Sequence, residues 1–295
     1  MSTKWTTADL PDLTGKTMIV TGATAGLGEV TTRELARAGA HVIMAVRNEQ
    51  KAANLVRGIG RTKGRIEIRR LDVADLESVR QFGRNWSGPI DVLINNAGIM
   101  QVPLAHTREG IELQMATNYI GAFALTSTLL PHITDRVVSL SSQLHRTGHV
   151  RLDDLDWKTR KYDDLAAYAD SKLAVVLFAS ELQRRLEAAN SSVRSIAAHP
   201  GIARTTLASH AGGLTGRINY LGPLLNTVEQ GALPTLYSAT QDVPGGSYVG
   251  PNGLASIKGY PKIRRPSRTA QDVNVASDLW KKTNTIVGQS LAFTL

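Results

Sequence analysis

The sequence predicts one α/β domain built on a doubly wound parallel sheet. Short runs rich in β-branched residues alternate with segments of helical periodicity from residue 17 to residue 198, a pattern typical of βαβ units. A chain of 295 residues can form one large domain. Because no internal repeat or low-complexity linker divides the chain, residues 1–295 are predicted to form a single domain with a substrate-loop region near 199–225.

The first strand is expected at Thr17–Thr21, followed by a glycine-rich turn and a helix over Glu29–Ala38 that Gly39 ends. Further strands are expected at His41–Val46, Ile66–Leu71, Asp91–Ile94, Arg136–Leu140 and Val193–Ala198, with a short one inside Gly245–Gly253. Helical patterns cover Asn48–Arg57, Leu76–Trp86, Glu109–Leu130 and Asp163–Ala189. A last helix is expected over Ala270–Val287, packed at the sheet edge. Right-handed crossovers would place helices on both faces of the sheet.

Composition excludes several classes of protein. There is no cysteine, so the chain has no disulfide framework, thiolate metal site or cysteine nucleophile. The formal net charge of +9 suits anionic ligands without choosing among them. No apolar run approaches the roughly 20 residues that span a bilayer, and residues 1–15 lack the features of a secretory signal. We therefore expect a soluble cytoplasmic protein without a membrane anchor.

A glycine-rich turn, TGATAGLG over Thr21–Gly28, joins the first strand to the first helix. Gly22, Gly26 and Gly28 can take positive φ and allow a ligand to approach the backbone. Free N–H groups at a helix N-terminus attract a pyrophosphate. The spacing Gly-x3-Gly-x-Gly meets the dinucleotide fingerprint in variant form. The alternative is a tight turn that binds no ligand.

The residues at the end of the second strand help to distinguish an NAD site from an NADP site. Sites selective for NAD place an acidic residue there to bind the ribose 2′-hydroxyl, whereas this chain has Val46 and Arg47. The Arg47 guanidinium can instead bind a 2′-phosphate. We therefore predict NADP(H) as cofactor, the alternative being a solvated surface arginine.

Tyr168 and Lys172 are four residues apart in the long helical segment Asp163–Ala189, so their Cβ atoms are expected about 6 Å apart on one face. A nearby ammonium lowers the pKa of a phenol, typically by roughly 1–3 units. Such a tyrosine could give and take a proton. On its own this pair also fits a half-buried tyrosine beside an exposed lysine.

Taken together, these features resemble the short-chain dehydrogenase/reductase family over most of the chain. The matching segments, in order, are TGATAGLG, Leu71–Val73, the NNAG element Asn95–Gly98, Asn118, Ser141-Ser142, the YxxxK motif of Tyr168 and Lys172, and His199–Gly201 with Thr205 beyond. Ala45–Asn48, NNAGIM and SSQLH look most like the retinol dehydrogenase-type branch and its bacterial relatives.

The resemblance implies a Rossmann-like sheet in the order 3-2-1-4-5-6-7 and a role for each catalytic residue. Tyr168 would exchange the proton with the substrate oxygen, which Ser142 would polarise, while Lys172 would hold the nicotinamide ribose. Asn118 would order a water beside Lys172. The predicted cofactor contacts are Gly22, Thr24, Gly26, Leu27, Gly28, Arg47, Asn48, Asp72, Val73, Asn95, Ala97, Gly98, Tyr168, Lys172, Pro200, Gly201, Ile202 and Thr205.

Two details of the site follow from the resemblance. Only one of Ser141 and Ser142 can face the cofactor, because neighbouring residues leaving a strand point in opposite directions; the family pattern favours Ser142. The extra residues Arg151–Lys161 before Tyr168 are expected to form a loop over the site. Ala174–Ala179 fits helix core or a subunit contact, and pairing through the fourth and fifth helices makes a homodimer or homotetramer a hypothesis.

Other features carry no prediction of function. The basic runs Arg61–Arg70 and Lys258–Arg268 lack aromatic platforms or a nucleic-acid module, so we interpret both as solvated surface, the second as an exposed loop. None of the seven histidines falls in an HExxH pattern, and no metal site is predicted.

The sequence thus predicts an NADP(H)-dependent carbonyl reductase or alcohol dehydrogenase acting on a small molecule. Glycines and leucines such as Gly212, Leu214 and Leu221 suggest a flexible lid with an apolar lining, hence an apolar substrate. Two alternatives are a catalytically silent NADP-binding regulatory or scaffold protein and a light-dependent reductase of a chlorophyll precursor.

Overall fold

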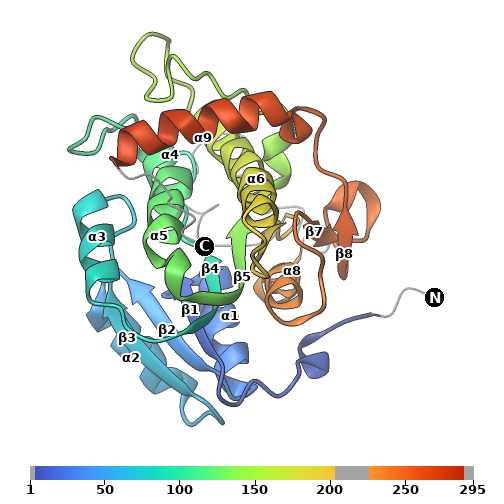
Figure 1. The fold of residues 1–295 in the computed structure, drawn as a ribbon. Helices are drawn as coiled ribbons and strands as arrows, with labels where there is room; N and C mark the ends of the chain where they lie inside the picture. Colours follow the sequence, from blue (N-terminus) through green and yellow to red (C-terminus); the bar gives the residue numbers. More distant parts are fainter. Residues whose placement is uncertain (1–3, 203–225, 289–295) are drawn as a thin grey trace.

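A computed structural model describes residues 4–202 and 226–288. Within them, one sheet of eight strands has the order β3-β2-β1-β4-β5-β6-β7-β8 (Figure 1). The strands β1 to β7 pair in parallel in the predicted order, and β8 pairs antiparallel with β7. The predicted fold class is therefore confirmed.

The strand bounds agree closely with the predicted ones. They are β1 (Thr17–Thr21), β2 (His41–Val46), β3 (Arg65–Arg70), β4 (Ile90–Asn95), β5 (Ile133–Leu140), β6 (Arg194–Ala198), β7 (Tyr248–Pro251) and β8 (Pro261–Arg264). The interpretation of Lys258–Arg268 as an exposed loop was wrong, because β8 lies inside it. This edge strand is four residues long and exposes Lys262 and Ile263 together, so no alternating hydrophobic pattern marks it.

Helices cover both faces of the sheet, as Figure 1 shows. Their bounds are α1 (Gly26–Arg37), α2 (Glu49–Ile59), α3 (Leu76–Arg84), α4 (Leu113–Met115), α5 (Gly121–Leu129), α6 (Asp164–Ala188), α8 (Val228–Thr240) and α9 (Val273–Val287). Side chains of alternate β1 residues pack on opposite faces of the sheet. Ile19 packs with the core under α3, α5, α6 and α9, whereas Met18 and Val20 pack with the core under α1 and α8.

Two helices differ from expectation. The segment Glu109–Leu130 becomes helical only at Leu113, because Gly110 has a φ of +78° in the preceding turn and Glu112 caps the helix. Helix α8 was not predicted at all, since Gly231 and Pro234 interrupt its pattern. Its capping box of Thr227 and Gln230 is the sequence signal that could have revealed it.

Helix α9 packs on α6 and α5 rather than at the sheet edge, so that part of the prediction was wrong. The Trp280 ring lies 4.8 Å from the Phe123 ring and 5.9 Å from the Phe178 ring, between centroids. The Tyr119 hydroxyl is 2.7 Å from the Thr283 hydroxyl. Ala174–Ala179 is buried throughout, and this segment is therefore helix core. Aromatic packing of Trp280 against Phe123 and Phe178 therefore places α9 on α5 and α6.

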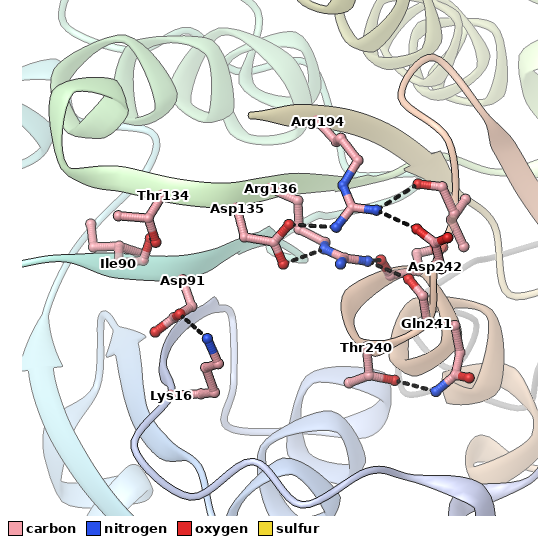
Figure 2. A network of polar contacts seen from close by, with 12 residues as sticks. Lys16, Ile90, Asp91, Thr134, Asp135, Arg136, Arg194, Thr240, Gln241 and Asp242 are labelled. Carbon is pink, nitrogen blue, oxygen red and sulfur yellow. Dashed lines mark hydrogen bonds and ion pairs between the residues drawn. The ribbon is translucent and has the colours of Figure 1, made fainter. Parts of the chain in front are cut away.

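A polar network joins the amino-terminal ends of neighbouring strands to the segment after α8 (Figure 2). The buried Arg136 guanidinium donates to the carbonyl oxygens of Ser238 and Gln241 at the end of α8, at 3.0 and 2.6 Å, and to Asp135. Arg194 contacts Asp135 at 2.6 Å. These contacts fix β5 and β6 to α8, at the edge opposite the carboxyl ends where a ligand would bind.

Candidate active site

A cleft of about 800 Å³ opens at the carboxyl ends of the parallel strands, where open α/β sheets bind ligands. The predicted site residues that line it are Gly22, Thr24, Gly26, Leu27, Gly28, Arg47, Asn48, Asp72, Val73, Ala97, Gly98, Ser142, Tyr168, Lys172, Pro200, Gly201 and Ile202. The fold thus brings together segments from six strand ends. Thr205, and the lid suggested by Gly212, Leu214 and Leu221, lie outside the described residues.

The glycine-rich turn has the geometry of an anion site. Gly22 and Gly26 have φ values of +64° and +55°, which other residues adopt with strain. Ala25 precedes α1 without any side-chain cap, so the first N–H groups of the helix are free for a ligand. A Cβ on Gly22 would lie 2.7 Å from the Ala97 Cα. Gly22 is therefore required by packing as well as by its backbone angle.

The part of the cleft that follows β2 is cationic. Arg47 and Lys51 are exposed and line it beside Asn48, whose side chain caps α2 by accepting from the Lys51 N–H at 2.8 Å. No carboxylate occupies positions 46 to 48. Lys51 was missed by the sequence analysis, although its place one helical turn after Arg47 could have indicated it. The two side chains fit a 2′-phosphate better than a free 2′-hydroxyl.

Ser142, Tyr168 and Lys172 meet where β5 ends against α6. The Ser142 hydroxyl lies beside the Tyr168 hydroxyl and lowers the pKa of that phenol, while its oxygen accepts from the Leu144 N–H at 3.2 Å. The Lys172 Nζ lies 5.7 Å from the centre of the Tyr168 ring and donates to the Leu140 carbonyl oxygen at 2.9 Å. Ser141 turns the other way and donates to the Lys172 carbonyl oxygen at 2.7 Å. Of the two serines, Ser142 is the one that faces Tyr168.

The electrostatics of this pair differ from expectation. Burial raises the pKa of Tyr168 to about 12, with the Ser142 hydrogen bond opposing the rise, and burial lowers the pKa of Lys172 to about 8. The prediction that Lys172 lowers the pKa of Tyr168 was wrong for this structure, because removal of the phenol from water dominates. Tyr168 is thus a phenol, and so a proton donor, at neutral pH.

Asn118 lies in a π-helical turn, Ala116–Ile120, between α4 and α5. Its amide accepts from the Ile99 N–H at 2.8 Å and donates to the Ile99 carbonyl oxygen and the Ser171 hydroxyl. Ser171 in turn donates to the Tyr168 carbonyl oxygen at 2.7 Å. Asn118 therefore contacts the backbone that carries the site rather than lining the cleft. Ser171, which the sequence analysis missed, links it to Tyr168.

Asn95 does not line the cleft. Its amide is buried and donates to the hydroxyls of Thr126 and Ser139, at 2.9 and 3.4 Å. The next residue, Asn96, lines the cleft and donates to the Thr21 carbonyl oxygen at 2.7 Å. The structure thus places Asn96 where the sequence analysis had placed Asn95.

Apolar side chains that were not predicted as site residues also line the cleft. They are Ile99 and Met100 after the NNAG element, Leu144 two residues after Ser142, and Leu165. Leu165 precedes Tyr168 by three residues on α6, so a shared helix face was the available signal. Apolar walls beside two hydroxyls fit a substrate with one polar group on an apolar body.

The segment 151–161 does not form the expected loop over the site. None of its residues lines the cleft, and Arg160 instead bridges Asp154 at 3.3 Å and Asp170 of α6 at 3.1 Å. Both carboxylates are buried. An ion pair with the helix that carries Tyr168 therefore holds this segment against α6.

The described residues lack both a membrane-spanning helix and a metal-binding cluster. They contain no helix with the length and apolarity to cross a membrane. They also contain no group of three histidine or acidic side chains arranged to hold a metal ion.

Comparison with known proteins agrees with this geometry. A family model described as short chain dehydrogenase matches residues 16–154. Human retinol dehydrogenase 13 is 40% identical over 93% of this chain and 85% of its own length. Mouse polyprenol dehydrogenase is 37% identical over 95% of this chain and 86% of its own length.

Two solved structures are similar. An uncharacterized protein from Mycobacterium paratuberculosis is 47% identical with a TM-score of 0.86, over 98% of this chain and 99% of that one. A putative NAD(P)-dependent gluconate 5-dehydrogenase from Beutenbergia cavernae, with bound NADP, is 26% identical with a TM-score of 0.63, over 80% and 95%. This chain belongs to the short-chain dehydrogenase/reductase family, in its retinol dehydrogenase-like branch, and is an oxidoreductase of the kind that uses a nicotinamide cofactor.

Proposed function

We propose that the chain is an NADP(H)-dependent oxidoreductase that interconverts an apolar aldehyde or ketone and the matching alcohol. The observation that carries the proposal is the Ser142–Tyr168 hydroxyl pair beside Lys172, in a cleft that the glycine-rich turn also lines. The retinol and polyprenol dehydrogenases among its relatives support an apolar alcohol or carbonyl compound.

The residues that line the cleft offer a partner for each part of NADP(H). The uncapped start of α1 would hold the pyrophosphate, Arg47 and Lys51 the 2′-phosphate, and Lys172 the hydroxyls of the nicotinamide ribose. Asp72 and Val73, which follow β3 next to β2 in the sheet, also line the cleft, and the adenine would lie against them. When bound, the cofactor supplies or accepts the hydride.

The protein's own part is proton transfer and orientation. In reduction, Tyr168 donates its hydroxyl proton to the carbonyl oxygen of the substrate, and Ser142 hydrogen bonds the same oxygen and polarises it. Because burial raises the pKa of Tyr168 to about 12, the phenol is fully protonated at neutral pH. Asn118, through Ser171, keeps the turn of α6 that carries Tyr168 in place.

The test is turnover of purified protein with NADPH and a panel of apolar aldehydes, ketones and quinones, followed by loss of absorbance. Wild type should oxidise NADPH with at least one member, and Tyr168→Phe should lose about 10²-fold or more in kcat while still binding NADPH in calorimetry. Cofactor binding without turnover on any member would favour the silent binding protein. Unchanged kcat in Tyr168→Phe would contradict the proton-donor role.

A further inference from the structure

A buried histidine beside the site has contacts that the proposed reaction does not yet use. His145 lies in η4, a 3-10 turn over Gln143–Thr147 that starts directly after Ser142, and its ring is fully buried. The His145 Nδ1 lies 2.7 Å from the Ser142 carbonyl oxygen, and its backbone N–H donates to the same oxygen at 3.1 Å. This carbonyl thus receives two hydrogen bonds from one residue.

The neighbours of His145 fix which ring nitrogen carries the proton. A carbonyl oxygen only accepts, so Nδ1 must donate to Ser142. On the other side, the Ser267 backbone N–H donates to Nε2 at 3.1 Å, so Nε2 must be bare. The Tyr248 ring packs against the imidazole edge to face, with centroids 5.1 Å apart. The Tyr248 hydroxyl lies 3.2 Å from Nδ1, and beside an Nδ1–H it accepts. The neutral tautomer with its proton on Nδ1 therefore satisfies all three hydrogen-bond contacts of the ring.

These contacts determine the direction of the Ser142 side chain. Ser141 is tied to α6 through the Lys172 carbonyl oxygen, which fixes the chain before Ser142. His145 fixes the carbonyl after it, and so the peptide plane between Ser142 and Gln143. With both sides held, the Cα–Cβ bond of Ser142 has one direction. The Leu144 N–H, one residue before His145, donates to the Ser142 hydroxyl oxygen at 3.2 Å, and the hydroxyl lies beside that of Tyr168.

Resting on the proposed function, we infer that His145 is a positioning residue for the reaction. Its Nδ1–H orients Ser142 through the Ser142 carbonyl, without contact to substrate or cofactor. A displacement of about 1 Å in a catalytic group can lower a rate by about 10²-fold, so loss of this hydrogen bond should lower kcat while cofactor affinity stays unchanged.

The kinetic test compares three variants of the full chain. His145→Leu keeps the bulk and removes all three ring hydrogen bonds, and it should lower kcat by about 10- to 100-fold with no change in the Kd for NADPH. His145→Asn places an amide N–H near the position of Nδ1 and should recover kcat to within about 3-fold of wild type. Arg146→Ala is the matched control. His145 and Arg146 both bond the segment 265–267, His145 through the Ser267 N–H and Arg146 through the Arg265 carbonyl oxygen at 2.9 Å. Arg146→Ala removes only the second of these bonds and should leave kcat unchanged.

A double-mutant cycle separates positioning from general support of the fold. If His145 acts through Ser142, His145→Leu should change kcat by less than about 2-fold in a Ser142→Ala background. Full additivity of the two losses, an equal loss in Arg146→Ala, or failure of His145→Asn to recover kcat would each overturn the inference.

A ligand-free measurement keeps this inference distinct from the proposed function. Imidazole ¹⁵N NMR of the wild-type protein without cofactor should show His145 as the neutral Nδ1–H tautomer. The opposite tautomer would overturn the inference even in an active enzyme. Absence of turnover with every substrate would refute the proposed function while the NMR result still reported on the arrangement around Ser142.

Discussion

Acid should destabilise the folded chain between pH 6.5 and pH 4 through two buried imidazoles. Burial lowers the pKa of His145 to about 4 and that of His199 to about 3, with Arg146 adding to the effect at both. In the unfolded chain a histidine titrates at about 6.5. As pH falls below 6.5, these histidines bind protons in the unfolded state but stay neutral in the folded state, so the free energy of unfolding falls.

The magnitude for His145 follows from the gap between its two pKa values. At about 1.4 kcal/mol for each pH unit, the roughly 2.5 units from 6.5 to 4 correspond to about 3.5 kcal/mol. Below pH 4 both states bind the proton and no further loss comes from this group. Burial raises the pKa of Glu112 and of Asp170, and these carboxyls act in the opposite direction as pH falls.

A difference experiment isolates the histidine from those carboxyls. Urea unfolding of wild type and His145→Asn is measured at pH 7.5, 6.5, 5.5 and 4.5, since Asn keeps the donor to Ser142 but does not titrate. The free energy of unfolding of wild type should fall relative to the variant by up to about 3 kcal/mol across this range. Parallel curves for the two proteins would refute the assignment of His145 as a buried neutral group.

Three further substitutions test other parts of the structure. Arg47→Asp should shift the NADPH/NADH ratio of kcat/KM toward NADH by about 10-fold or more, because the proposed attraction between Arg47 and the 2′-phosphate becomes a repulsion; an unchanged ratio would show that Arg47 does not contact the cofactor. Lys172→Met should weaken NADPH binding in calorimetry as well as kcat, and retention of both would remove Lys172 from the site. Arg136→Met should lower the free energy of unfolding by about 3 kcal/mol, measured by urea at pH 7.5, because it leaves the Ser238 and Gln241 carbonyl oxygens and Asp135 (Figure 2) without that donor; a loss below about 1 kcal/mol would contradict this.

Local chemistry made much of the fold predictable from the sequence. The strands with continuous apolar runs, such as β2, and the glycine-rich turn before α1 lie where their patterns indicated. Segments with mixed patterns were missed for equally local reasons. Strand β8 has a proline, two cations and one isoleucine, and α8 contains Pro234. Their structure depends on partners elsewhere in the chain, namely β7 for the strand.

The candidate site shows the same division. Strand parity could have corrected Asn95, because it shares a face of β4 with Leu93, whose side chain packs in the core under α5. The pKa of Tyr168 could not be predicted. The four-residue spacing to Lys172 was visible in the sequence, whereas burial, the dominant cause of the shift, depends on how the rest of the chain closes around the phenol.

Backbone carbonyls are the common anchor of the groups proposed to do chemistry. Ser141 donates to the carbonyl of Lys172, Ser171 to that of Tyr168, and His145 to that of Ser142. Each donor is a buried side chain, and burial makes an unpaired polar group costly by about 1–3 kcal/mol. The contacts therefore persist whether or not a ligand is bound, and the geometry of Ser142, Tyr168 and Lys172 is set before substrate arrives. Substitution of His145 should consequently affect turnover more than cofactor affinity, because Ser142 is not one of the proposed cofactor contacts. Substitution of Ser141 should lower both, because Ser141 holds the backbone of Lys172, which is proposed to hold the nicotinamide ribose.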